Sequence, residues 1–550
     1  MRVSQAIAEI LKREGVEHLF AYPLNPLIEA AAEADIRPII VRQERTGVHM
    51  ADAFSRMTSG NVVGVFCMQA GPGVENSFGA VAQAYSEAVP LIVIPGGAAR
   101  AQSWVKPAFN ATLNYQHITK WAEQVTTAAG AVAAMRRAFT QARNGRPGPV
   151  LIEIPGDLWG EEVPEPFEYT PTTRALSRPD WPSIEAAAQA LVDAERPVIY
   201  AGQGVHYARA WDELKQLAEL LETPVTTSLE GKSSFPENHP LSLGSGGVAM
   251  PASVFQHVQD ADVIFGAGAS FTATGFGIRF PTAGKTFIHN TVDAMDINKN
   301  IPTEQPLIGD AKLTLAGLVE AVSARLGGKP RGRFEEVVTR IKSQKDPWLQ
   351  EWLPRLTSDE TPLQSYRVIW DLLHTVDVAN TVITHDAGSP RDELSPFWET
   401  TAPLSYIGWG KSTQLGYGLG LAMGAKMAHP DKLCINMWGD AAIGMTGMDF
   451  ETAVRERIPI LSILMNNFSM AMEIPAMKLS DEKYDTTDIS GNYSEFARAL
   501  GGYGERVTEP SEIVPAIKRG IAATQSGRPA MLEFITTKEK IYSTFRSGYH

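Results

Sequence analysis

The chain has 550 residues, of which 44% are hydrophobic and 20% are charged, and its formal net charge at pH 7 is -13. A chain of this length is expected to fold into about three domains, each with a packed core. Nucleic acids and anionic membranes bind through clustered lysine and arginine, so the acidic balance argues against both as the main partner and favours a small-molecule substrate.

The N-terminal segment is predicted to be a folded helix. It carries charge throughout and places Val3, Ile7 and Leu11 on one helical face, which is not typical of a signal peptide. No apolar run approaches the ~18 residues that a membrane span needs. Cys67 and Cys434 lie in apolar runs that read as buried strands, so we expect reduced, inert thiols. These features predict a cytoplasmic protein.

Hydrophobic runs typical of buried strands alternate with helical stretches along the whole chain. This alternation predicts an α/β fold with parallel sheets covered by helices on both faces. The pattern breaks near 164–182 and 327–346, so we expect three successive Rossmann-like domains at 1–165, 182–328 and 360–550. The expected strands span 16–22, 38–41, 62–68 and 91–95 in the first domain, 197–201, 224–228, 261–266 and 286–289 in the second, and 381–385, 433–438, 459–466 and 529–534 in the third.

A run of small residues follows the expected strand 433–438, namely Gly439, Asp440, Ala441 and Ala442. Small residues let the backbone approach an anion closely, and the N-terminus of a following helix offers free N–H groups. We expect that helix to begin near Thr446, with Asp449 three residues later in a capping position. The pattern predicts a phosphate site that uses no lysine.

A metal ion is expected beside this phosphate. Asp440 supplies a carboxylate at the end of one strand, and the next strand, 459–466, brings Asn466 and Asn467 to the same edge of the sheet. Phosphate held by backbone groups still needs charge neutralisation, and Mg²⁺ prefers oxygen ligands of this kind. Either pair alone would indicate only a turn or a strand end. Their placement on adjacent strands predicts a Mg²⁺ site.

The run Gly439-Asp440-Ala441, separated by 24 residues from Asn466-Asn467, resembles the fingerprint of enzymes that use thiamine diphosphate. The stretches 15–23, 146–155 and 196–204 are similar to acetolactate synthase and benzaldehyde lyase relatives. The resemblance implies a pyrimidine-binding, a central and a diphosphate-binding domain, in that order. It also implies thiamine diphosphate and Mg²⁺ as cofactors, and a homodimer or homotetramer with active sites at the subunit interface. The implied metal ligands are Asp440, Asn467 and Ser469.

The same resemblance implies roles for residues outside the fingerprint. Glu44, after the expected strand 38–41, matches the glutamate that contacts N1′ of the aminopyrimidine and so helps to form the reactive carbanion. Leu415 matches the bulky residue that wedges between the two cofactor rings, and Thr413 lies where backbone groups hold the pyrimidine. The stretch Ala387-Gly388-Ser389 matches a second loop that faces the diphosphate.

Two further residues are candidates for catalytic contact with the substrate. Asn25 matches a position that faces C2 of the cofactor in related decarboxylases, and Gln69 matches a position that holds substrate or a proton-transfer group. The alternatives are an asparagine that caps its own loop and a glutamine that bonds only to backbone. Both interpretations stay open at this point.

The expected reaction makes or breaks a carbon–carbon bond next to a carbonyl, by 2-oxoacid decarboxylation, acyloin cleavage or carboligation, as a lyase or a transferase. Hydrolytic cleavage of a diketone and true acetolactate synthesis are the alternatives within catalysis. A cofactor-binding scaffold without turnover is a third, against which Glu44 argues. The stretch 269–275 has no arginine where acetolactate synthases bind the acceptor carboxylate. In the central domain His289-Asn290-Thr291 replaces the usual acidic pair, so FAD binding stays open.

Overall fold

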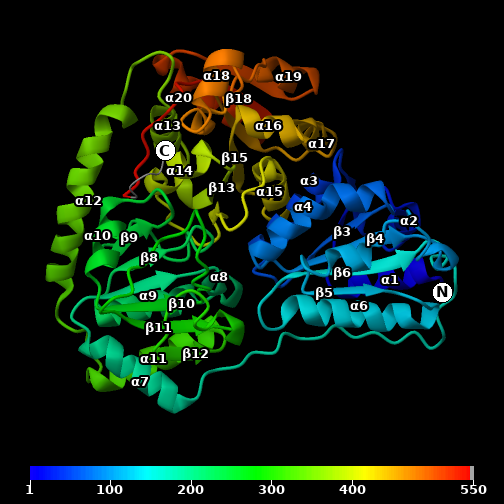
Figure 1. Cartoon of the computed structure of the whole chain (residues 1–550), viewed down its shortest axis with the longest axis horizontal. Helices are drawn as coiled ribbons and strands as arrows, with labels where there is room; N and C mark the ends of the chain where they lie inside the picture. The colour runs from blue at the N-terminus through cyan, green and yellow to red at the C-terminus, as the bar shows by residue number, and fades with distance from the viewer. Residues whose placement is uncertain (546–550) are drawn as a thin grey trace.

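The computed structural model describes residues 1–545, which form three α/β domains in chain order (Figure 1). In this view the N-terminal domain lies on the right, the central domain at the lower left and the C-terminal domain at the top. Each domain is built on one six-stranded sheet in which every pair of neighbouring strands is parallel. The predicted α/β fold with three successive parallel sheets is therefore confirmed.

The N-terminal sheet has the strand order β2-β1-β3-β4-β6-β5. Its central strands are buried along their whole length, which is why they read as continuous apolar runs in the sequence. The predicted N-terminal helix is confirmed as α1, which buries Val3, Ile7 and Leu11. The strands are β1 (His18–Tyr22), β2 (Arg37–Ile40), β3 (Gly64–Met68), β4 (Leu91–Gly97), β5 (Trp121–Gln124) and β6 (Pro149–Pro155). The helices are α1 (Val3–Arg13), α2 (Asn25–Glu33), α3 (Glu44–Met57), α4 (Pro72–Ser86), α5 (Ala111–Tyr115) and α6 (Ala128–Arg143).

The central sheet has the order β12-β11-β10-β7-β8-β9, so the direction of winding reverses between β10 and β7. Ligands of doubly wound sheets bind at such a reversal, beyond the carboxyl ends of the strands. The strands are β7 (Pro197–Ala201), β8 (Val225–Thr227), β9 (Ser242–Ser245), β10 (Val263–Ala267), β11 (Thr286–Thr291) and β12 (Gln305–Ile308). The helices are α7 (Trp181–Asp193), α8 (Gly204–Ala208), α9 (Trp211–Leu221), α10 (Ala252–Asp260) and α11 (Ala311–Arg325).

The C-terminal sheet has the order β14-β13-β15-β16-β18-β17, with its first reversal between β13 and β15. The strands are β13 (Thr381–His385), β14 (Tyr406–Ile407), β15 (Leu433–Gly439), β16 (Leu461–Asn466), β17 (Tyr503–Val507) and β18 (Ala530–Ile535). The helices are α12 (Phe334–Leu356), α13 (Ser365–Thr375), α14 (Ser389–Phe397), α15 (Tyr417–Ala428), α16 (Asp440–Thr446), α17 (Phe450–Arg455), α18 (Lys478–Tyr484), α19 (Tyr493–Ala499) and α20 (Ile513–Gln525). Cys67 in β3 and Cys434 in β15 are both buried and free, as expected.

The connection predicted at 327–346 is helical over most of its length. Helix α12 begins at Phe334 and forms the long rod at the left edge of the molecule (Figure 1). Its first half buries Val338 and Ile341 against the central domain, and its second half buries Trp348 and Trp352 against the C-terminal domain. The apolar residues of this mostly polar helix form two separate stripes, one for each domain, so the sequence shows no single helical periodicity. No helix within residues 1–545 is long and apolar enough to cross a membrane.

The chain returns to the central domain after β18. Tyr366 donates a hydrogen bond to the carbonyl of Ile541 at 2.7 Å, and the Ser543 hydroxyl donates to the carbonyl of Met250 at 2.7 Å. The end of the C-terminal segment therefore fastens the C-terminal domain to the central one.

Candidate functional site

A pocket of about 710 Å³ opens where β13, β15 and β16 end. These strands are neighbours in one parallel sheet, so the loops that follow them meet at the same edge. Ten of the predicted cofactor-binding residues line this pocket, whereas Thr413 is not among the lining residues. The ten are Ala387, Gly388, Ser389, Leu415, Gly439, Asp440, Ala441, Ala442, Asn467 and Ser469.

Asp440 is the charged centre of the pocket. Its carboxylate is 4% exposed and accepts the backbone N–H groups of Asn467 and Ser469, each at 3.1 Å, and of Ala441 at 2.9 Å. Burial raises the pKa of Asp440 to about 6, although these N–H groups oppose the shift. Within residues 1–545 no cationic side chain pairs with Asp440. A buried carboxylate with donors on one side and no counter-charge fits a bound cation.

The loop after β16 places the other two predicted metal ligands. The Asn467 side-chain oxygen accepts the Ser469 N–H at 3.0 Å, and the Ser469 hydroxyl contacts Thr487. In the described part of the chain no three His, Cys, Asp or Glu side chains gather as a metal cluster. A cation here would therefore depend on Asp440, on neutral oxygens of the loop and on phosphate oxygens, as Mg²⁺ does when it binds diphosphates.

Helix α16 begins at Asp440 and ends at Thr446, and a 3-10 turn with Thr446 at its N-cap position follows over Gly447–Asp449. A helical segment therefore begins next to Thr446 as expected, but the predicted cap is wrong, because the Thr446 side chain makes no capping hydrogen bond. Thr446 donates its hydroxyl to the carbonyl of Gly416 at 2.9 Å, and Asp449 accepts the N–H of Arg42 at 2.7 Å. The small residues after Gly439 already form the first helical turn, which brings the backbone of Ala441 to the pocket wall.

Asp386, which the sequence analysis did not single out, ties two walls of the pocket together. It is fully buried and accepts the N–H groups of Ala387 at 2.8 Å, Gly416 at 2.9 Å and Gly418 at 3.0 Å. Burial raises its pKa to about 6. These bonds fix Leu415, next to Gly416, relative to the loop that begins at Ala387. An acidic residue directly after an expected strand was the available signal.

Further polar and apolar residues complete the pocket. Gly388 has φ +81°, and a Cβ there would lie 3.6 Å from the sulfur of Met472, so this methionine sits over the loop. Pro390 and Met472 line the pocket together with residues that were not predicted, namely Ser365, Glu393, Met465, Met470, Ala471, Glu473, Thr536 and Thr537. They come from segments far apart in the chain, which sequence spacing cannot bring together.

The three predicted catalytic residues lie in the N-terminal domain and do not line this pocket. Glu44 is 3% exposed, begins α3 and accepts the Asn76 amide at 3.2 Å. A Cβ at Gly73 would lie 3.3 Å from Glu44 Oε1 and 3.0 Å from Gln69 Cγ, so Glu44 and Gln69 flank the same turn. Asn25 begins α2 with an exposed side chain and is not a capping residue, because the N-cap is Leu24.

A second cavity lies beyond the carboxyl ends of β7 and β10, at the reversal of the central sheet. Gly202 and Gly268 pack so closely that a Cβ at Gly202 would lie 2.5 Å from the Gly268 carbonyl. Of the expected acidic-pair positions, Thr291 lines the cavity, while Asn290 bonds to the Gly268 N–H and to the carbonyl groups of Leu307 and Gly309.

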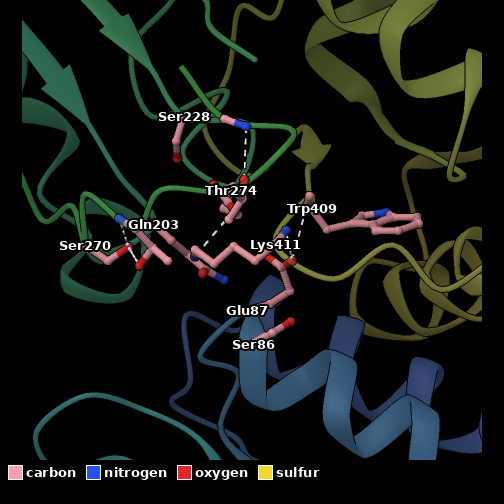
Figure 2. A network of polar contacts seen from close by, with 12 residues as sticks. Ser86, Glu87, Gln203, Ser228, Ser270, Thr274, Trp409 and Lys411 are labelled. Carbon is pink, nitrogen blue, oxygen red and sulfur yellow. Dashed lines mark hydrogen bonds and ion pairs between the residues drawn. The ribbon is translucent and has the colours of Figure 1, made fainter. Parts of the chain in front are cut away.

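All three domains meet at one end of this central cavity. Figure 2 shows Glu87 of the N-terminal domain beside Lys411 and Trp409 of the C-terminal domain, with Gln203, Ser228, Ser270 and Thr274 from the central domain. Glu87 Oε1 accepts the N–H of Lys411 at 2.7 Å and of Gly410 at 3.1 Å. The Lys411 ammonium lies 3.4 Å from Glu230 of the central domain.

The carboxyl groups of Glu87 and Glu230 influence each other's charge at this junction. Within residues 1–545, Glu87 Oε2 has no hydrogen-bond partner. Burial and the charge of Glu230 raise the pKa of Glu87 to about 7. Burial also acts to raise the pKa of Glu230, but Lys411 and several hydrogen bonds outweigh it and lower the pKa to about 2. Glu87 is therefore the carboxyl group of this pair that binds a proton first as the pH falls.

Comparison with known proteins matches each domain to a model of thiamine pyrophosphate enzymes. The N-terminal TPP binding domain matches residues 1–134, the central domain residues 184–318, and the C-terminal TPP binding domain residues 386–534. The chain is 30% identical over 97% of its length to a probable acetolactate synthase large subunit of Methanocaldococcus jannaschii, of which 92% is covered. It is 25% identical over 98% of its length to the acetolactate synthase isozyme 3 large subunit of Escherichia coli, of which 96% is covered.

Proposed function

The chain belongs to the family of thiamine pyrophosphate-dependent enzymes and resembles acetolactate synthases, and from this premise we propose that its C-terminal pocket binds Mg²⁺ and the diphosphate of thiamine diphosphate. The proposed reaction makes or breaks a carbon–carbon bond next to a carbonyl group. The observation that supports this best is the convergence of three loops, after β13, β15 and β16, around the buried carboxylate of Asp440.

In this proposal each loop has a separate task. Asp440, Asn467 and Ser469 would hold the cation, and the backbone around Gly388 and Ala441 would hold the phosphate oxygens. Leu415, which Asp386 fixes through Gly416, would support the bend between the two rings. Thiamine diphosphate, when bound, supplies a carbanion that reacts with carbonyl carbons.

Glu44 is the proposed acid of the site. It would hold a proton at N1′ of the aminopyrimidine, and Gln69, beside it at Gly73, is placed to contact the substrate. Because neither lines the pocket of its own chain, we propose that Glu44 of a second copy completes each site, in a homodimer or larger assembly. A catalytic contact by Asn25, whose exposed side chain stands at the first residue of α2, stays a proposal of the same kind.

The reaction itself is tested by product analysis. Purified protein with thiamine diphosphate and Mg²⁺ is given 2-oxoacids with and without a second carbonyl acceptor, then acyloins and cyclic diketones. Carbon dioxide release with a new acyloin would identify carboligation. Cleavage of an acyloin would identify a lyase, and an open-chain acid from a cyclic diketone would identify hydrolysis. The proposal fails if no substrate reacts while the cofactor is bound.

The central cavity is the proposed site of FAD. Its place at the sheet reversal and its glycine-rich walls support a dinucleotide. Purified protein is then expected to absorb at about 450 nm, where oxidised flavins absorb. Protein that lacks this band, and does not gain it on incubation with FAD, would remove the proposal and leave the thiamine diphosphate site unaffected.

A further inference from the structure

Glu393 is a buried carboxyl group in the wall of the C-terminal pocket. It lies on α14, four residues after Ser389, so the two side chains share one face of the helix. Both line the pocket, and Glu393 is only 2% exposed. The proposed phosphate loop ends at Ser389. Glu393 therefore sits one helical turn behind the place where the diphosphate would bind.

The charged groups around Glu393 disfavour its ionised form. Glu539 and Asp392 both raise the pKa of Glu393. Arg391 forms two 2.8 Å hydrogen bonds with Asp392, and Arg355 lies 3.3 Å from Glu539. Within residues 1–545, no lysine or arginine is among the residues that line the pocket.

The remaining neighbours of Glu393 are neutral. Ser365 acts to lower the pKa of Glu393, and Tyr366 and Tyr542 lie close enough to feel its charge. Tyr542 is held in place by the Ser389 hydroxyl at 2.8 Å. Burial, followed by the effect of Glu539, raises the pKa of Glu393 to about 8, so its neutral form predominates at pH 7.

A neutral carboxyl group and a carboxylate act in opposite ways on an anion. A carboxylate beside a diphosphate repels it, whereas a neutral carboxyl group has an O–H that can donate to a phosphate oxygen. We propose that Glu393, in its neutral form, is a hydrogen-bond donor of the pocket and positions the diphosphate end of the ligand from the α14 side. This inference rests on the proposed function of the same pocket.

The inference predicts that binding and protonation are linked. A bound anion favours the neutral form of Glu393, so near pH 8 binding should be accompanied by proton uptake, and above that pH affinity should fall. Asp440 does not produce the same signal, because its pKa is about 6 and it is ionised throughout this range.

The test measures Mg²⁺–thiamine diphosphate binding by tryptophan fluorescence between pH 7 and pH 9, and proton uptake by calorimetry in two buffers of different ionisation enthalpy. Affinity of the unaltered protein should fall by up to about tenfold from pH 8 to pH 9. Glu393→Gln should bind as well at pH 7 but with no fall and no proton uptake, because an amide donates at every pH. Glu393→Leu should bind about tenfold more weakly at all pH values.

Glu473→Gln is the matched control, because Glu473 lines the same pocket but is exposed. It should keep the pH dependence of the unaltered protein. A fall with pH that persists in Glu393→Gln would overturn the inference, as would affinity that rises with pH. Thermal unfolding shows that each variant is folded. If the unaltered protein does not bind the cofactor at any pH, the proposed function fails instead, and Mg²⁺–pyrophosphate then tests the anion site by itself.

Discussion

Two buried aspartates end neighbouring strands of the C-terminal sheet, and their surroundings give them different roles. Asp386 follows β13 and accepts three N–H groups from two loops, so its carboxylate links these two loops to each other. Asp440 follows β15 and also accepts three N–H groups, but these come from the turn it starts and from the next strand end, and the carboxylate lines the pocket. The first is a structural group and the second is a ligand-binding group.

Asp440→Asn is expected to weaken Mg²⁺-dependent thiamine diphosphate binding by more than about 100-fold, since changes even one shell outside a metal cost about 10–100-fold. Without cofactor the variant should unfold at the same temperature or higher, because a buried carboxylate without a counter-charge is replaced by a neutral amide. Titration by fluorescence and a thermal unfolding scan check both parts. Unchanged Mg²⁺ dependence would contradict the role given to Asp440.

At the scale of the elements, the sequence predicted the buried central strands. It did not predict the short edge strands or the helix α12, which packs against two domains. The ranges 197–201 and 381–385 coincide with β7 and β13, because central parallel strands are apolar from end to end. Edge strands such as β14, which has two residues, and β5 have no such run. The fingerprint residues could be assigned to one pocket because each of them directly follows a strand that the sequence predicts. Glu393 and Thr536 also line the pocket, but they come from other segments, and only the packing of the fold brings them there.

Trp352→Ala tests the packing of the connecting helix α12. Trp352 packs against Phe397 at 5.1 Å and Tyr366 at 4.9 Å between ring centroids, and Phe397 ends α14, which carries Ser389 and Glu393. Removal of this side chain should destabilise the fold by about 3–5 kcal/mol. Gln350→Ala, at an exposed position of the same helix, should change stability by less than about 0.5 kcal/mol. Equal shifts of the unfolding transition in the two variants would show that α12 is not packed as described.

On the scale of the whole molecule, the N-terminal and C-terminal domains make an intimate contact within one chain. Helix α15 carries Gly420 and Gly424 against α3, where a Cβ at Gly424 would lie 2.2 Å from the Met50 carbonyl. The Glu87–Glu230 pair adds the central domain to this junction. Close backbone packing, together with the hydrogen bonds that Glu87 accepts from Gly410 and Lys411, therefore holds the N-terminal and C-terminal domains in their orientation.

Glu87→Gln is expected to make the fold less sensitive to pH. The pKa of Glu87 is about 7 in the fold against 4.5 as its ordinary value, so its contribution is present below pH 4.5 and is lost as the pH rises through 7. The amide still accepts the N–H of Lys411 and needs no proton. The variant should be more stable than the unaltered protein at pH 8, by about 1–3 kcal/mol, and should lose this advantage at pH 5. A constant difference at both pH values would show that the pKa of Glu87 is not raised in the fold.

Subunit complementation tests whether Glu44 acts across an interface. Glu44→Gln and Asp440→Asn, each expected to be inactive alone, are refolded together from equal amounts of denatured chain. If Glu44 of one copy serves the Asp440 pocket of the other, each mixed dimer contains one site with both residues intact, so the mixture should regain roughly a quarter of the unaltered activity. If both residues serve the same chain's site, no mixed dimer has an intact site and activity stays absent. Unaltered protein refolded in the same way gives the reference yield, and light scattering confirms that the refolded chains have assembled into oligomers.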